Sequence, residues 1–120
     1  MKEIKHIFEP NPLACGQAVI AMLTGEDVNS IIKLVGTDRE TTLADMRATL
    51  LEFGFTLLSE RKQAIKLSDL PETALLSLET IKCWHWSLYA CGKVYDPEYG
   101  VLDGFPESKR KYYWEITEQP

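Results

Sequence analysis

The sequence is poor in cationic residues and has no long apolar run. Lys and Arg total 13 against 18 for Asp and Glu, and the net charge over 120 residues is −5. Nonspecific binding to nucleic acid or to an anionic membrane needs a cationic surface, so we expect neither partner. No apolar run approaches the roughly 18 residues of a membrane span, and residues 1–8 lack the apolar block of a secretory signal. These absences argue against an exported or lipid-anchored protein and predict a cytoplasmic one.

Cysteine is also scarce, and the chain contains no internal repeat, low-complexity tract or linker. The three cysteines, Cys15, Cys83 and Cys91, are an odd number without a signal peptide, which is not the pattern of a disulfide framework. We therefore expect reduced thiols. With 45% apolar and 26% charged residues, the composition is that of a soluble globular protein. The length predicts one domain over residues 1–120, and the sequence does not indicate an oligomeric state.

Apolar residues recur at helical spacing in the first half of the chain. They predict three helices, over residues 15–24, over residues 28–35 and from near residue 41 or 42 to residue 53. Asp27 is suited to cap the second helix, and Asp45 can complete a capping box at the start of the third. Each predicted helix is followed directly by a glycine, a residue that commonly ends helices.

The second half of the chain contains shorter segments typical of strands. These extended segments are predicted over residues 55–58, 74–79, 84–90, 93–96 and 112–117. Residues 68–71 are predicted to form a turn, and residues 97–108, with two prolines and two glycines, a surface loop. Helices followed by an antiparallel sheet indicate an α+β fold.

The segment around Cys15 puts a thiol in the opening turn of an apolar helix. Unpaired backbone N–H groups and the helix dipole favour an anion there, so we expect a lowered pKa for this thiol. Gly16 would let a substrate backbone approach closely, and an N–H group at the helix start can point at a developing oxyanion. The alternative is a small buried cysteine that packs a helix end.

A second segment puts a histidine and an aspartate on adjacent strands. If Cys91 and Gly92 form a two-residue hairpin turn, Ser87 pairs with Asp96. His85 and Asp96 then share one face of the sheet as diagonal neighbours, about 7 Å apart by backbone. A three-residue loop would put them on opposite faces. The alternatives are a core histidine and a turn carboxylate.

Together these residues suit nucleophilic catalysis. A histidine held by a carboxylate and facing a thiol at a helix N-terminus can take the thiol proton, while the carboxylate fixes the imidazole tautomer. The order along the chain is Cys15, His85 and Asp96, on a helix, a strand and an adjacent strand.

A series of short motifs covers most of residues 8–100. They are ACGQAVIAMLTG at 14–25, TTLADM at 41–46, LLSL at 75–78, HWSLY at 85–89 and VYDPEYG at 94–100. Their order and spacing resemble the papain-like cysteine peptidase superfamily, and most closely its small bacterial branch that includes bacteriocin leader-processing (double-glycine) peptidases. The resemblance implies a papain-like α+β fold, Cys15 as nucleophile, His85 as general base and acid, and Asp96 as its orienter. It also implies a peptide or protein substrate, with no cofactor.

One position departs from the family pattern. Family members commonly carry a glutamine six residues before the cysteine, where this chain has Glu9. An ionised carboxylate would repel an oxyanion, and losing one donor costs about 2.7–4 kcal/mol in a well-studied case. Asn11 could donate instead, although Asn11-Pro12 also suits a helix N-cap followed by proline at the first helical position. A protonated Glu9 could donate if its pKa were raised. The oxyanion-hole candidates are therefore Glu9, Asn11 and the backbone at Cys15.

A zinc site is a second chemistry to weigh. Cys83 and His85 are two residues apart on a predicted strand, so their side chains face the same way, and Cys91 is nearby in sequence. The paired knuckles of common structural sites are absent and no fourth ligand is evident. We therefore expect no metal.

Other features allow non-catalytic interpretations. Aromatic residues around Trp84 and Trp86 could form a ligand platform, but aromatics on strands usually serve packing. The cationic run at residues 109–111 is predicted to be a solvated loop cluster. Because of Glu9, a papain-like domain that has lost catalysis and binds a peptide or protein is the main rival to a peptidase. An amide or acyl transfer reaction, such as deamidation, could use the same residues.

Overall fold

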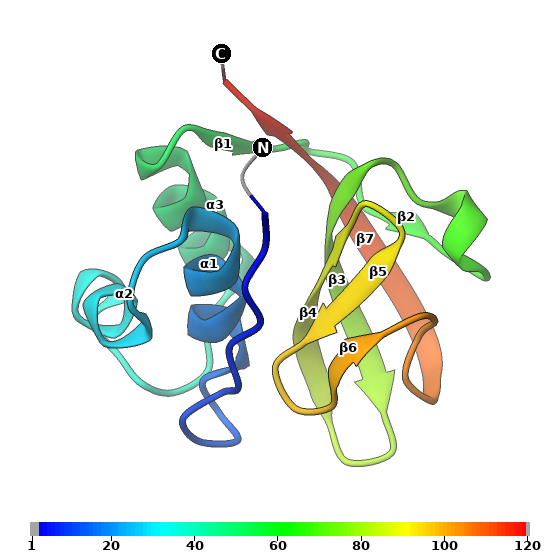
Figure 1. Cartoon of the computed structure of the whole chain (residues 1–120), viewed down its shortest axis with the longest axis horizontal. Helices are drawn as coiled ribbons and strands as arrows, with labels where there is room; N and C mark the ends of the chain where they lie inside the picture. Colours follow the sequence, from blue (N-terminus) through cyan, green and yellow to red (C-terminus); the bar gives the residue numbers. More distant parts are fainter. Residues whose placement is uncertain (1–2, 120) are drawn as a thin grey trace.

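Three helices form the first half of the chain in the computed structural model, which describes residues 3–119 (Figure 1). They are α1 (Cys15–Thr24), α2 (Val28–Val35) and α3 (Leu43–Glu52), so the three predicted helices are confirmed. Gly25 and Gly36 end the first two because each adopts the left-handed conformation, with φ of 80° and 94°. None of the helices within the described range is both long and apolar enough to cross a membrane. The predicted domain over residues 1–120 includes residues 1, 2 and 120, which lie outside that range.

Side-chain caps begin the second and third helices as predicted. The Asp27 carboxylate accepts the N–H of Asn29 at 3.2 Å. At the start of α3, Thr42 Oγ1 accepts the N–H of Asp45 at 3.1 Å, and Asp45 Oδ2 accepts the N–H of Thr42 at 3.0 Å. This reciprocal pair is the predicted capping box.

The first helix begins differently from the prediction. Its N-cap is Ala14, which has no side-chain cap. Asn11 instead closes a turn ahead of the helix: Asn11 Oδ1 accepts the N–H of Leu13 at 2.8 Å, and its carbonyl accepts the N–H of Ala14 at 3.1 Å. The alternative in which Asn11 is the N-cap, with Pro12 at the first helical position, is therefore wrong, because this turn uses residues 11–14 before the helix starts.

The second half of the chain forms an antiparallel sheet in the order β1-β7-β3-β4-β5-β6, with β2 paired to β7 off this path. Its strands are β1 (Phe55–Leu57), β2 (Lys62–Gln63), β3 (Thr73–Thr80), β4 (Trp84–Ala90), β5 (Lys93–Asp96), β6 (Gly100–Leu102) and β7 (Ser108–Glu118). A short 3-10 helix, Leu67–Asp69, overlaps the predicted turn. Each predicted extended segment overlaps a strand, although β1 ends one residue before the predicted segment 55–58, and β4 and β5 have the predicted bounds.

Two predictions of loop structure are wrong. Within residues 97–108, β6 pairs with β5, and Gly100 stands opposite Asp96. The chain can turn back from β5 into β6 because Gly100 adopts a φ of 92°, which a residue with a side chain rarely accepts. The cationic run at residues 109–111 belongs to β7 rather than to a loop, and Arg110 Nε donates to Glu79 on the neighbouring strand β3 at 2.8 Å.

The sheet is packed on both faces, and the helices lie along one side of it (Figure 1). Leu75 and Leu88 belong to a core cluster shared with the helices, whereas Leu76 and Tyr89 belong to a second cluster. Successive residues of a strand point to opposite faces, so each of these strands contributes to both clusters. On β4, His85 therefore falls on the same face as Tyr89.

Candidate active site

The hairpin between β4 and β5 has the register that the sequence predicts. Cys91 and Gly92 both adopt positive φ, 49° and 88°, as a two-residue hairpin turn requires. Ala90 pairs with Lys93, and Leu88 pairs with Tyr95. This register brings His85 and Asp96 to one face of the sheet, as predicted, and their side chains are in contact.

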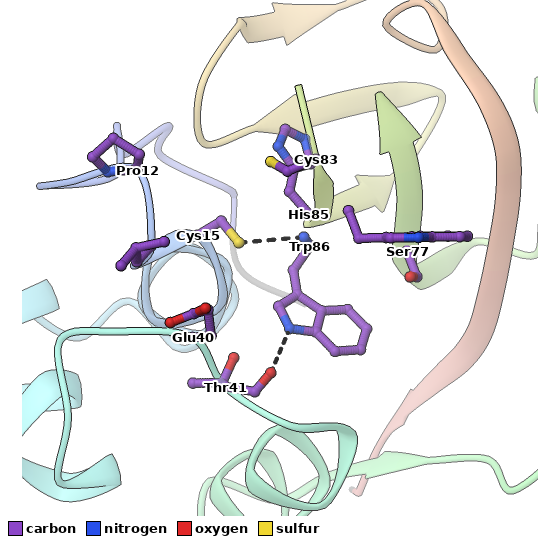
Figure 2. Close-up of a pocket in the computed structure, with 10 residues that line it drawn as sticks. Pro12, Cys15, Glu40, Thr41, Ser77, Cys83, His85 and Trp86 are labelled. Atoms are coloured by element: carbon purple, nitrogen blue, oxygen red, sulfur yellow. Dashed lines mark hydrogen bonds between the residues drawn. The ribbon is translucent and has the colours of Figure 1, made fainter. Parts of the chain in front are cut away.

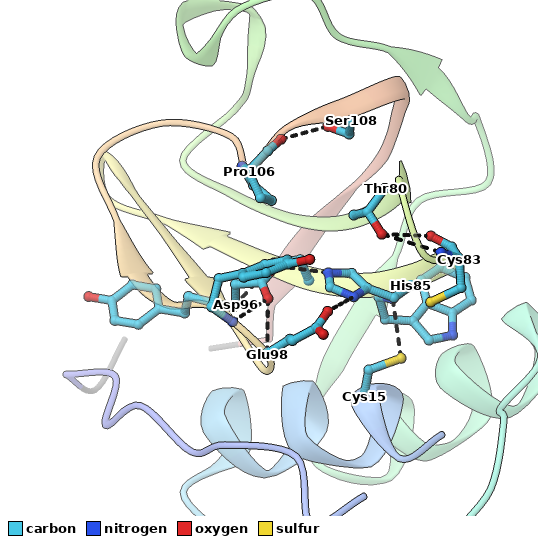
Figure 3. Close-up of polar contacts among 12 residues, drawn as sticks. Cys15, Thr80, Cys83, His85, Asp96, Glu98, Pro106 and Ser108 are labelled. Carbon is cyan, nitrogen blue, oxygen red and sulfur yellow. Dashed lines mark hydrogen bonds and ion pairs between the residues drawn. The ribbon is translucent and has the colours of Figure 1, made fainter. Parts of the chain in front are cut away.

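His85 and Asp96 form a buried pair (Figure 3). His85 Nε2 lies 2.9 Å from Asp96 Oδ2, and the same oxygen accepts the hydroxyl of Ser87 at 2.9 Å. The other carboxylate oxygen, Oδ1, accepts the backbone N–H groups of Glu98 at 2.9 Å and Tyr99 at 3.0 Å. Four groups therefore fix the Asp96 carboxylate, and the carboxylate fixes the orientation of the imidazole ring.

The pKa values of this pair move in opposite directions. Burial lowers the pKa of His85, but the hydrogen bond and charge of Asp96, together with the charges of Glu9 and Glu98, outweigh it, so the pKa is raised above its ordinary value. Burial raises the pKa of Asp96, but the hydrogen bond and charge of His85 and the backbone N–H groups outweigh it, so that pKa is lowered. The pair thus favours a carboxylate beside an imidazolium.

Cys15 is the first residue of α1, and its thiol meets the start of β4 (Figure 2). Strand β5 pairs with β4 only at residues 88–90, so the earlier part of β4 has no partner on that side. There the backbone N–H of Trp86, which follows His85 in the chain, donates to Cys15 Sγ at 3.4 Å. Figures 2 and 3 show the thiol directed from the helix toward this part of the strand.

The predicted lowering of the Cys15 pKa is wrong. Burial raises the pKa of the thiol to about 11, and the negative charge of Glu9 adds to the rise. The N–H groups of Trp86 and Gly16 act in the opposite direction but do not offset the burial. The helix end is enclosed by other elements, with Cys15 only 8% exposed, so loss of hydration outweighs the helix dipole.

Gly16 has a packing role that the sequence did not indicate. A Cβ atom at this position would overlap Thr41 Oγ1 and lie 2.9 Å from Met46 Sδ. The glycine therefore lets α1 approach the start of α3, and the space that it leaves is filled by protein rather than open to a substrate backbone.

Cys15 and His85 both line a cleft of about 370 Å³. One wall is formed by the segment before α1, including Pro12 and Leu13, and another by the start of β4, including Trp86 (Figure 2). The loop before α3 completes the cleft with Glu40 and Thr41, and it is tied to β4 by the indole N–H of Trp86, which donates to the Thr41 carbonyl at 3.1 Å.

The loop before α3 is also hydrogen-bonded to α1. Gln17 is fully buried, and its side-chain nitrogen donates to the carbonyls of Thr37 at 2.7 Å and Arg39 at 2.8 Å. The residues that shape the cleft are therefore held by hydrogen bonds from the helix that carries the thiol.

Glu9 lies beside the paired residues. Its N–H donates to the carbonyl of Pro97 at 2.9 Å, which holds the N-terminal segment against the turn after β5. Its Oε1 is buried and has no hydrogen-bond partner among residues 3–119. Burial and the charges of Glu98 and Asp96 raise the pKa of Glu9 to about 7, against the opposing charges of His85 and Lys82. A neutral Glu9 is thus accessible near neutral pH.

Asn11, the other side-chain candidate for the oxyanion hole, is already engaged. Its amide nitrogen donates to the carbonyl of Asp38 at 3.0 Å, and its amide oxygen accepts the N–H of Leu13. Cys15 and His85 thus line one cleft, His85 contacts Asp96, and the Asn11 amide is directed into the loop before α3.

Glu98 is a site residue that the sequence interpretation missed. Its Oε1 lies 3.7 Å from His85 Nδ1, the nitrogen that does not face Asp96 (Figure 3). Its Oε2 lies 3.0 Å from Lys82 Nζ. The sequence offered one indication of this role: Glu98 comes two residues after Asp96, in a turn whose backbone N–H groups can donate to the Asp96 carboxylate.

A metal site finds no support among residues 3–119, because no three His, Cys, Asp or Glu side chains are arranged to hold an ion there. All three cysteines are free, and Cys83 and Cys91 are exposed. Cys91 lies in the hairpin turn at the far end of β4 from Cys83 and His85, so these three do not converge.

The aromatic residues divide between packing and surface. Trp86 lies 5.9 Å from the ring of Trp114, both packed with the helix-side core. Trp84 is half exposed, and it stacks on Tyr112 at 6.0 Å, with the guanidinium of Arg110 5.3 Å from its ring. Only Trp84 and Trp86 of these line the cleft.

Comparisons with known proteins bear on the fold. No family model matches the chain, and no curated protein matches its sequence. Among solved structures, the chain is similar to the crystal structure of the peptidase domain of Streptococcus ComA, a bi-functional ABC transporter involved in a quorum-sensing pathway. The TM-score is 0.65 at 15% identity, over 98% of this chain and 100% of that one. The predicted α+β fold, with helices packed on an antiparallel sheet, is thereby confirmed, and it is the fold of that peptidase domain.

Proposed function

We propose that the chain is a cysteine peptidase-like hydrolase that cleaves a peptide or related amide bond through a thioester on Cys15. One observation carries the proposal: His85, whose Nε2 lies 2.9 Å from Asp96 Oδ2, lines the same cleft as the thiol at the start of α1. A nucleophile, a base and a group that orients the base are the components of acyl transfer.

The reaction begins with a neutral thiol, since the pKa of Cys15 is raised to about 11. His85 acts in its neutral form, which it reaches by losing the Nδ1 proton. It then keeps its Nε2–H on Asp96 and takes the thiol proton at Nδ1 as Sγ bonds to the substrate carbonyl carbon. The tetrahedral intermediate collapses, the C–N bond breaks, and imidazolium returns its proton to the leaving amine. Water then attacks the thioester, His85 takes a proton from it, and the acid product leaves as the thiol is reformed.

The oxyanion of each intermediate needs hydrogen-bond donors. The backbone N–H at Cys15 is one candidate, and Glu9 in its neutral form is the second. The raised pKa of Glu9, about 7, and its unpartnered Oε1 within the described residues support this role. Asn11 is the weaker candidate, because its amide would first have to leave the Asp38 carbonyl.

A second candidate function is a catalytically impaired domain that binds a peptide or protein. The raised pKa of the Cys15 thiol favours it, because a neutral, buried thiol is a poor nucleophile unless a base activates it. The two functions share the cleft but differ in whether His85 changes the reactivity of Cys15.

An electrophilic peptide probe separates the two functions. We expect a peptidyl vinyl sulfone to modify Cys15 faster than the more exposed Cys83 and Cys91, as located by mass spectrometry of the labelled protein. The His85→Ala variant should lose this preference, whereas the Cys83→Ser variant, altered in the same cleft, should keep it. Equal and slow modification of all three thiols, unchanged in His85→Ala, would favour the binding domain.

A further inference from the structure

The imidazole of His85 has a carboxylate on each of its two nitrogens. Asp96 Oδ2 lies 2.9 Å from Nε2, and Glu98 Oε1 lies 3.7 Å from Nδ1 (Figure 3). The first contact is fully buried, whereas the Glu98 side chain is 24% exposed. Nδ1, the nitrogen that the proposed reaction uses for proton transfer, therefore faces the Glu98 carboxylate.

Glu98 is held in this position from two sides. Its backbone N–H donates to Asp96 Oδ1 at 2.9 Å, so the turn that carries it is tied to the same carboxylate that orients His85. Its second oxygen, Oε2, accepts a hydrogen bond at 3.0 Å from Nζ of Lys82, which lies in the turn between β3 and β4. One oxygen thus faces the imidazole and the other faces an exposed lysine.

We propose that Glu98 is a positioning residue of this site: its carboxylate holds the Nδ1 proton of a charged His85, and Lys82 offsets part of the negative charge of Glu98. The catalytic consequence rests on the proposed function. Asp96 and Glu98 together stabilise imidazolium, the form that protonates the leaving amine, and Lys82 offsets part of the Glu98 charge so that the neutral base is still reached.

Other charged and titratable groups lie around His85. The charge of Glu9, in the N-terminal segment, acts on the imidazole. Cys15 of α1 and Cys83 of the turn before β4 line the same cleft, and Lys82 of that turn contacts Glu98. Tyr99, which follows Glu98, has its ring 6.1 Å from the imidazole. Glu9 acts in the same direction as Glu98 on the charge of His85, so the test must leave Glu9 unchanged and vary Glu98 and Lys82 alone.

The titration of His85 by NMR measures this charge directly. The chain has two histidines, so the spectrum of a His85→Gln variant identifies the signal of His85. We expect its titration midpoint to move to lower pH in Glu98→Gln, where the charge is lost. It should move to higher pH in Lys82→Met, where Glu98 is no longer offset. Glu26→Gln, an exposed change beyond the far end of α1, is the matched control and should leave the midpoint unchanged.

The same variants then report on Cys15. Below the midpoint, Glu98→Gln should alkylate faster than the parent, by up to about tenfold for each pH unit that the midpoint moves, and above it the two rates should converge. A purely structural role for Glu98 would lower the rate at every pH instead.

An unchanged midpoint in a folded Glu98→Gln variant would overturn the proposal, and so would a shift of both variants in one direction. If Glu98→Gln does not fold, Glu98→Asp decides. Withdrawing the carboxylate from Nδ1 should lower the midpoint, and an unchanged value would contradict the proposal. The NMR result needs no activity, so it is distinct from failure of the proposed function, in which Cys15 would show no preference for the peptide probe.

Discussion

The N–H of Trp86 donates to Cys15 Sγ at 3.4 Å, which joins the first residue of α1 to the strand that carries His85. The contact is possible because β5 pairs with β4 only from residue 88 onward, which leaves the N–H of Trp86, earlier in β4, open toward the helix. The helical and sheet halves of the fold therefore meet at the proposed nucleophile.

Asp96→Asn should lower the rate of Cys15 labelling by the peptide probe by about a hundredfold or more, because an amide no longer fixes the imidazole tautomer. Asn has nearly the same shape, so the fold should be kept, as circular dichroism would report. Asp103→Asn is the matched control: Asp103 also contacts a cation, Lys93 Nζ at 2.8 Å, but it is exposed and outside the site. Equal labelling of the Asp96 variant and the parent would show that Asp96 does not assist His85.

Glu9→Gln should stabilise the protein more at pH 8 than at pH 4.5. The pKa of Glu9 is about 7 in the folded protein, against an ordinary value of 4.5. Between these values the folded state holds a proton that the unfolded state has lost, so stability falls as pH rises, and the penalty persists above pH 7. Urea unfolding at both pH values measures the difference, with Glu26→Gln as the control. The same gain at both pH values would contradict the raised pKa.

The pH profile of Cys15 labelling should depend on Glu9 as well. Ionised Glu9 opposes the negative charge that develops at the site, so labelling of the parent should fall behind that of Glu9→Gln as pH rises past about 7. Glu9→Gln supplies an uncharged donor at every pH. A constant ratio of the two rates across this range would exclude Glu9 as the group responsible.

Gly16→Ala should lower the free energy of unfolding by about 1–3 kcal/mol, the usual cost of overpacking a core. Its Cβ would meet Thr41 Oγ1 and Met46 Sδ, both held in the junction of α1 with α3. Gly104→Ala is the control, because a Cβ there meets no atom within 4 Å. Urea unfolding of the two variants tests this, and equal stability would show that the α1–α3 contact yields without cost.

Local signals in the sequence predicted the helices and the hairpin well. The caps at Asp27 and Asp45 act within a few residues of their own position, and they define the starts of α2 and α3. A two-residue hairpin loop is limited to turns with positive φ, which Gly92 accepts readily, so Cys91-Gly92 sets the register that pairs His85 with Asp96.

Properties that depend on distant contacts were not predictable in the same way. The helix dipole at Cys15 is local, but the burial that raises its pKa arises from packing against β4 and the N-terminal segment. Glu98 gained a place in the site only because the turn after β5 folds back onto Asp96. The strand β6 was missed for a related reason, since it forms by pairing with β5 rather than from its own composition.

The most direct test of the central claim is the rate at which iodoacetamide alkylates Cys15 near pH 7.5, with and without His85, in a background where Cys83 and Cys91 are serine. A small reagent needs no recognition by the cleft, so the rate reports only how the imidazole activates the thiol. The account predicts that His85→Ala slows alkylation by about tenfold or more. Equal rates in the two proteins would contradict it, because His85 would then not act on Cys15.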